Sequence, residues 1–147
     1  MRVSASRKES WVKDNLKGYY PIALEMATRL DSKMSTSFLK KWPTLADLKK
    51  ARPAALTRFF NDSSCRSRKL IEERLLQIKS SREVSEDQKL ISVESEYMIM
   101  LVDQIELLRK QIAKLDELIE REFQNHPDRA IWDSFPGAGE ALSPRLA

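Results

Sequence analysis

The residues best suited to binding chemistry lie near the end of the sequence, where Pro136 precedes Gly137, Ala138 and Gly139. A Pro-Gly-x-Gly turn between two helical segments is typical of a helix-hairpin-helix, because glycine adopts positive φ readily and leaves the backbone N–H groups unobstructed. At the start of the following helix such N–H groups can bind a phosphate. The same Gly-x-Gly spacing also occurs at ordinary helix C-termini, so the turn alone leaves a purely structural role open.

Lysine and arginine are concentrated in the first part of the chain. Residues 1–82 contain 19 Lys and Arg against 8 Asp and Glu, a net charge of +11, whereas residues 83–147 contain 7 against 14, a net charge of −7. A segment this basic is suited to a polyanion such as nucleic acid, and we expect Arg66, Arg68 and Lys69 to be among the residues that meet phosphates. The same charges would also serve to solvate short helices, and the charge count does not separate these two interpretations.

The sequence has no set of residues with catalytic spacing. His126 is the only histidine, and it precedes a proline at a predicted helix end, where capping is the expected role. Cys65, the single cysteine, cannot form an internal disulfide and has no general base beside it, so a small buried hydrophobe is predicted there. We therefore expect no catalytic residue, no metal site and no cofactor in this chain.

The most regular hydrophobic pattern predicts one long helix over residues 91–123. Its apolar residues recur at spacings of 3 and 4 through three heptads, which is the pattern of a coiled coil. The predicted seam, through which two copies would associate, consists of Met98, Leu101, Ile105, Leu108, Ile112, Leu115 and Ile119. Ile at a with Leu at d favours a parallel dimer, although an antiparallel partner helix from the same chain would bury the same stripe.

The rest of the chain reads as short amphipathic helices separated by Pro, Gly and Ser. The predicted helices cover residues 4–16, 22–30, 32–41, 45–51, 54–60 and 67–79, with a further helical turn at 129–133. We expect Trp42 to anchor the core of this cluster, and residues 61–64 to form a loop. In the helix at 67–79 the residues predicted to face the core are Leu70, Ile71, Leu75 and Ile78.

Together these patterns predict an all-α chain in four segments. They are a connector helix at 1–21, a basic cluster of short helices at 22–82, a long coiled-coil helix at 83–125 and a partial helix-hairpin-helix at 126–147. The longest apolar run is far shorter than the roughly 20 residues that span a bilayer, and no signal-peptide pattern follows Met1. A cytoplasmic protein without a membrane role is therefore expected.

Several short blocks of sequence occur in an order and at a spacing that match one protein family. The blocks are KWPTL at 41–45, ARPAAL at 51–56, LIEER at 70–74, and HPD at 126–128 followed by PGAG at 136–139. In these blocks the chain resembles the middle of the bridge-RNA-guided insertion-sequence transposases, the IS one-ten group. The resemblance covers nearly the whole chain.

This resemblance implies a mobile-element protein of three parts, which acts in DNA transposition and recombination. The parts are a RuvC-like nuclease domain with four acidic catalytic residues, a helical and coiled-coil middle, and a C-terminal domain with a catalytic serine. The chain is similar to the middle and to the start of the last part, so the catalytic residues, and any divalent metal, are expected outside this truncated fragment. The implied partners are DNA, a structured guide RNA, and a second copy or an intact transposase held through the coiled coil. The alternative is a coiled-coil adaptor that binds protein and no nucleic acid.

Overall fold

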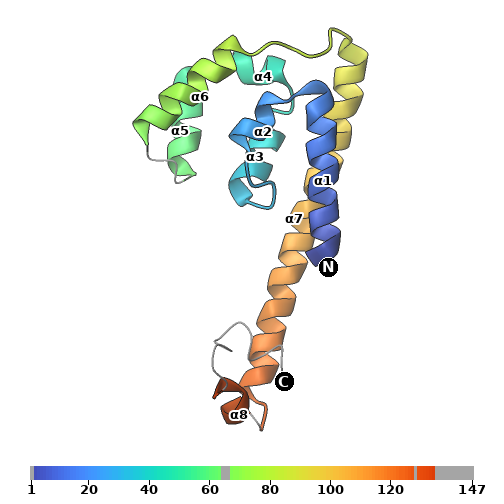
Figure 1. Cartoon of the computed structure of the whole chain (residues 1–147), viewed down its shortest axis with the longest axis vertical. Helices are drawn as coiled ribbons and strands as arrows, with labels where there is room; N and C mark the ends of the chain where they lie inside the picture. Colours follow the sequence, from blue (N-terminus) through green and yellow to red (C-terminus); the bar gives the residue numbers. More distant parts are fainter. Residues whose placement is uncertain (1, 64–66, 128, 135–147) are drawn as a thin grey trace. The chain divides into compact units, whose positions relative to one another are not determined.

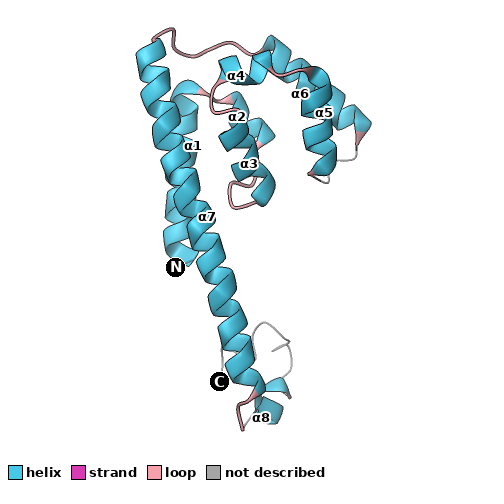
Figure 2. Cartoon of the chain, turned by 180° about the vertical axis from the view of Figure 1, so that it is seen from behind, coloured by secondary structure: helices cyan, strands magenta, loops and turns pink. Residues whose placement is uncertain are grey.

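The computed structural model describes residues 2–63, 67–127 and 129–134, and within these residues all regular structure is helical (Figures 1 and 2). The prediction of an all-α fold is confirmed. The helices are α1 (Arg2–Tyr19), α2 (Ile22–Met26), α3 (Lys33–Lys41), α4 (Leu45–Lys50), α5 (Pro53–Asp62), α6 (Arg68–Ser80), α7 (Gln88–Gln124) and α8 (Arg129–Asp133). Apart from the end of α2, their bounds lie within three residues of the predicted ones. The predicted loop at 61–64 begins later, because α5 continues through Asp62.

Local sequence explains where the short helices begin. The Thr44 hydroxyl accepts a hydrogen bond from the N–H of Asp47 at 3.1 Å and caps α4, and the Ser67 hydroxyl accepts from the N–H of Leu70 at 3.4 Å and caps α6. Such side-chain caps satisfy backbone donors that have no partner within the helix. Pro53 occupies the first turn of α5, where its missing N–H is not needed.

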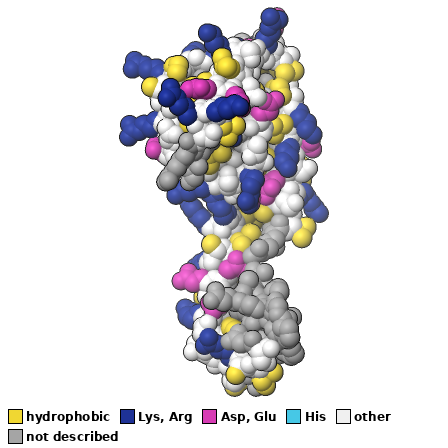
Figure 3. Space-filling model, turned by 60° about the vertical axis from the view of Figure 1, so that its left-hand side comes forward, with side chains coloured by type: hydrophobic (Ala, Val, Ile, Leu, Met, Phe, Trp, Pro, Cys, Tyr) yellow, Lys and Arg dark blue, Asp and Glu magenta, His cyan; other side chains and the backbone are white. Residues whose placement is uncertain are grey.

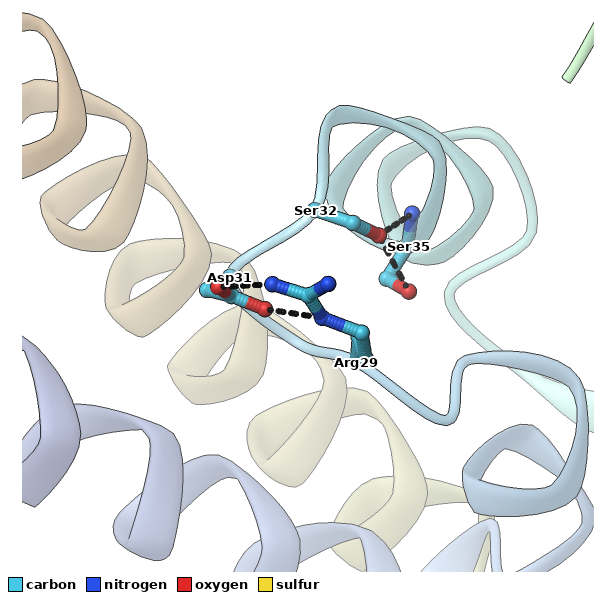
Figure 4. A network of polar contacts seen from close by, with 4 residues as sticks. All are labelled: Arg29, Asp31, Ser32 and Ser35. Atoms are coloured by element: carbon cyan, nitrogen blue, oxygen red, sulfur yellow. Dashed lines mark hydrogen bonds and ion pairs between the residues drawn. The ribbon is translucent and has the colours of Figure 1, made fainter.

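The helix α2 ends four residues before its predicted end, which corrects the prediction for 22–30. Ala27 leaves the helical conformation, with φ −107° and ψ 63°. In the loop that follows, the Arg29 guanidinium donates to the Asp31 carboxylate through Nε at 3.4 Å and Nη2 at 3.0 Å (Figure 4). The Ser32 hydroxyl caps α3 by accepting from the N–H of Ser35 at 3.1 Å, and it donates to the hydroxyl of Ser35 at 2.9 Å. The polar side chains of this loop therefore bond within the loop, as Arg29 and Asp31 do, or to the first turn of α3, as Ser32 does.

The chain divides into two compact units, Met1–Leu107 and Leu108–Ala147, and the boundary falls inside α7. This grouping differs from the four predicted segments, since helices α1 to α6 share one hydrophobic core with the first half of α7. The described part of the second unit contains the rest of α7, with Phe123 buried, and α8.

Four aromatic side chains from α3 and α5 and the turn after α3 pack together in the core of the first unit. They are Phe38, Trp42, Phe59 and Phe60, and the ring centroids that are in contact lie 5.1 to 6.2 Å apart. Trp42 is buried, which confirms its predicted role as a core anchor. The Lys41 ammonium lies 4.9 Å from the centre of the Trp42 ring, so the edge of the cluster is covered by a cation.

The helix α6 buries a narrower face than its sequence predicts. Ile71 and Ile78 are buried and Leu75 is half-buried, as expected, but Leu70 is 40% exposed. Leu76, on a different side of the helix, is 66% exposed. The reason is that α6 meets its neighbours along one line of residues at i and i+7, which leaves the flanking leucines in solvent.

The first half of α7 is held by side chains from α1 and α3, and both views show α1 lying antiparallel beside it (Figures 1 and 2). The Asn15 side-chain amide donates to the Glu94 carboxylate. Lys40 Nζ donates to Asp103 Oδ1 at 2.7 Å and to Glu106 Oε2 at 3.0 Å. These contacts give acidic residues of α7 partners from the basic part of the chain.

We expect Lys40→Gln to lower the free energy of unfolding by about 0.5–1 kcal/mol at neutral pH, because the ion pairs are partly exposed. Hydrogen bonds from Asp103 and Glu106 raise the pKa of Lys40 above its ordinary 10.5. The stabilisation is therefore complete below pH 10.5 and is lost as the pH rises through the raised pKa. Urea unfolding at neutral and at alkaline pH measures this difference. Lys33→Gln on the same helix is the control, and equal losses for both variants would contradict the assignment.

Two adjacent tyrosines of the first unit form a matched pair for a test of buried hydroxyl groups. The Tyr19 hydroxyl donates to the backbone carbonyl of Pro43 at 3.0 Å, whereas the buried Tyr20 hydroxyl has no hydrogen-bond partner within the described residues. Burial raises the pKa of both phenols, so both stay protonated. We expect Tyr19→Phe to cost about 1 kcal/mol and Tyr20→Phe to leave stability unchanged or higher, measured by denaturant unfolding. A larger loss for Tyr20→Phe than for Tyr19→Phe would contradict this expectation.

Candidate nucleic-acid interface

The helices α4, α5 and α6 carry a dense set of basic side chains. Figure 3 shows dark-blue Lys and Arg side chains projecting around the face of the first unit to which α5 and α6 belong. The described residues between 45 and 82 include nine Lys and Arg against four Asp and Glu. The nine are Lys49, Lys50, Arg52, Arg58, Arg68, Lys69, Arg74, Lys79 and Arg82, and all except the half-buried Arg74 are exposed. We call these helices and their basic side chains the basic surface.

Only some of these cations are neutralised by carboxylates. Arg58 and Arg68 each pair with a carboxylate one turn further along their own helix, at 3.9 and 2.9 Å. Within the described part of the chain, no carboxylate lies within ion-pair distance of Lys50, Arg52 or Lys69. Exposed cations of this kind are able to exchange solvent counterions for the phosphates of a nucleic acid.

The structure describes two of the six residues predicted to bind phosphate. Arg68 and Lys69 are neighbours in the first turn of α6, both exposed, and the Arg68 Nε already lies 2.9 Å from Glu72 Oε1. The other four, Arg66, Gly137, Ala138 and Gly139, lie outside the described residues, as does Cys65. The described basic surface therefore adds Lys50 and Arg52 to the residues predicted to bind phosphate. The sequence signal for both is the clustering of cations around the helix break at Ala51–Pro53.

The first part of the predicted coiled-coil seam is occupied by the chain itself. Met98, Leu101 and Ile105 are at most 3% exposed and belong to the core of the first unit. In the single chain these three residues are therefore already buried against their own fold, and their assignment to oligomerisation stays a prediction. The partner that buries this part of the stripe is intramolecular, as the antiparallel alternative allowed.

The second part of the predicted seam lies in the second unit and stays more open. Leu115 is 42% exposed and Ile119 is 39% exposed, while Leu108 and Ile112 are half-buried. The spacing of these four residues still fits a coiled-coil seam. Self-association through them remains a prediction.

No group of three or more His, Cys, Asp or Glu side chains among the described residues is arranged to hold a metal ion. None of the described helices has a stretch long and apolar enough to cross a bilayer.

Comparison of the chain with protein-family models, with curated proteins and with solved structures finds no match. The likeness to insertion-sequence transposases therefore rests on the sequence blocks alone.

Proposed function

We propose that this chain is a nucleic-acid-binding and self-associating segment of a DNA transposase of the bridge-RNA-guided insertion-sequence group. The observation that supports nucleic-acid binding is the separation of charge within the fold. Unpaired exposed cations gather on α4 to α6, whereas acidic side chains of α7 such as Asp103 bond cations of the same chain. The sequence blocks, in their order, support the family.

The chemistry of the proposed interface is electrostatic. Phosphate contacts from Lys50, Arg52 and Lys69 would fix the position of a nucleic acid without reading its bases. We therefore expect duplex DNA and structured RNA to bind with similar affinity. The proposal assigns no strand cleavage to residues of this chain, in line with the family resemblance.

A direct binding titration tests the proposal. Fluorescence anisotropy of a labelled DNA duplex and a labelled RNA hairpin is followed as the full chain is added at low salt. Non-specific complexes have dissociation constants of about 10⁻⁴ to 10⁻⁶ M at physiological salt and bind more tightly at low salt. We expect saturable binding of both ligands at micromolar protein or below. An absence of binding at low salt would overturn the proposal and leave the adaptor function.

The part of the seam that stays open, Leu108 to Ile119, supports the self-association in this proposal. The same observation favours the alternative function, a coiled-coil adaptor that binds protein and no nucleic acid. We expect the chain to form dimers or larger assemblies, and Ile112→Asp to shift them toward monomer by at least about tenfold in dissociation constant. Light scattering over a range of concentrations measures the shift. Ala113→Asp introduces the same charge at the adjacent exposed position and is the control. A strictly monomeric wild type, or an unchanged mass for Ile112→Asp, would contradict the prediction.

A further inference from the structure

An apolar groove lies between α6 and the helices α4 and α5 in the first unit. It has a volume of about 560 Å³. Leu48 and Leu56 line it from one side, and Leu75, Leu76 and Ile78 line it from α6. Leu76 is 66% exposed, so the groove presents a large aliphatic side chain to solvent. Two cations, Lys49 and Lys79, stand at its rim.

The first half of α7 has a second apolar stripe that the chain leaves uncovered. The stripe consists of Leu90, Val93, Tyr97, Met100 and Leu107, which are between 45 and 66% exposed. Their spacings of 3, 4, 3 and 7 place them on one face of a helix, away from the face that is buried on the core. An exposed row of large apolar side chains on one face marks an interaction surface more often than a solvated one.

The stripe and the groove have opposite charge. Residues 83–107 contain seven Asp and Glu against one Lys, and Glu96, which lies between Val93 and Met100 along the helix, is exposed. Glu96 has no cation within ion-pair distance among the described residues. Pairing two α7 stripes face to face would bring two such acidic segments together, which is repulsive. The groove instead offers Lys49 and Lys79 beside an apolar wall, and its one carboxylate, Glu72, is already paired with Arg68 at 2.9 Å.

The groove and the stripe of one chain do not meet. Both views of the first unit show α6 and the first half of α7 standing apart, with the other helices of the unit between them (Figures 1 and 2). A copy of the chain therefore has one vacant groove and one vacant stripe at the same time.

We infer that the α7 stripe of one copy docks in the α4–α6 groove of a second copy. An amphipathic helix laid into an apolar groove is a common mode of recognition, with anchors at i, i+3 and i+7, and the stripe supplies Leu90, Val93 and Tyr97 at these spacings. The contact is head-to-tail, because the two surfaces are different. The groove shares Lys49 and Lys79 with the basic surface, but the contact uses neither the three cations assigned to phosphate, Lys50, Arg52 and Lys69, nor the seam at Leu108 to Ile119.

Complementation between two variants tests this inference. Leu76→Asp disables the groove and keeps the stripe, whereas Met100→Asp disables the stripe and keeps the groove. Both residues are exposed, so we expect both variants to fold. Circular dichroism checks that they do. With Ile112→Asp in every protein to remove association through the seam, we expect each variant injected into itself in isothermal titration to show at least about tenfold weaker association than the Ile112→Asp parent. When Leu76→Asp is injected into Met100→Asp, the intact stripe of the first variant can dock in the intact groove of the second. This mixture should therefore restore one contact of wild-type affinity.

A charge swap gives a second readout. Lys79→Glu should weaken the association, and mixing it with a copy that carries Glu96→Lys should restore it. Two results would overturn the inference: mixed variants that associate no better than the separate ones, or a Leu76→Asp variant that associates like the wild type. If Leu76→Asp associates like the wild type while Met100→Asp fails to associate, the stripe pairs with the stripe of a second copy and not with the groove. Anisotropy with labelled duplex DNA should be unchanged for Met100→Asp, which keeps this test independent of the proposed function.

Discussion

Phe38→Ala is expected to lower the free energy of unfolding by about 3–5 kcal/mol, the range for truncating a buried aromatic side chain. Phe38 is fully buried, and its ring centroid lies 5.4 Å from that of Trp42, 6.0 Å from that of Phe59 and 6.2 Å from that of Phe60. The substitution removes one partner from three ring contacts and leaves a cavity that the surrounding rings cannot fill. Since domains are stable by only about 5–15 kcal/mol, such a loss would leave the first unit close to unfolding.

Urea unfolding followed by far-UV circular dichroism and by tryptophan fluorescence measures this effect. Phe38→Leu keeps most of the buried volume and is the matched control, with an expected cost of about 1.5 kcal/mol or less. A loss below about 1 kcal/mol for Phe38→Ala would mean that the aromatic cluster is not the centre of this core.

The triple substitution Lys50→Glu, Arg52→Glu and Lys69→Glu is expected to weaken binding to duplex DNA and hairpin RNA by about a hundredfold at low salt. These three exposed cations have no carboxylate partner within the described residues, so their reversal disturbs no ion pair of the fold. Loss of three phosphate contacts should also reduce the slope of log K against log salt by about three. Anisotropy titrations at several salt concentrations give both quantities.

A second triple variant controls for total charge. Lys89→Glu, Lys110→Glu and Lys114→Glu change the net charge by the same amount through exposed residues of α7. We expect this variant to keep most of the affinity. Equal losses for the two triple variants would show that net charge alone, and not the basic surface, determines binding.

Most helix bounds could be predicted from the sequence because their determinants are local. Thr44, Ser67 and Pro53 act within a residue or two of the helix start, and hydrophobic periodicity identifies the rest. The end of α2 could not be predicted in this way. Leu30 fits the helical spacing of residues 22–30, but it reaches the core from a loop, and that packing depends on tertiary contacts.

The face of α7 that meets its own chain could not be predicted either. One stripe containing Met98 and Ile105 satisfies an intramolecular or an intermolecular partner equally well, and only the fold shows that α1 and α3 hold this half of the helix. The apolar row from Leu90 to Leu107 was hidden by the more regular seam beside it. The spacing of this row can be read from the sequence, but its exposure to solvent depends on the fold.

The positive charge of the candidate interface could be predicted from the sequence, but the cations that lack a carboxylate partner could not. The excess of Lys and Arg in residues 1–82 is a property of the sequence, but which cations are free depends on the turns of α5 and α6 that place carboxylates beside Arg58 and Arg68. The predicted glycine turn at 137–139 lies outside the described residues and stays a prediction.

The salt dependence of nucleic-acid affinity tests the central claim most directly. The affinity of the full chain for a labelled DNA duplex is measured from about 50 to 200 mM salt, where each phosphate contact contributes a slope of about −0.9 in log K against log salt. With contacts from Lys50, Arg52, Lys69 and their neighbours, we predict a slope of about −3 or steeper. A flat dependence, or no binding at the lowest salt, would contradict the account.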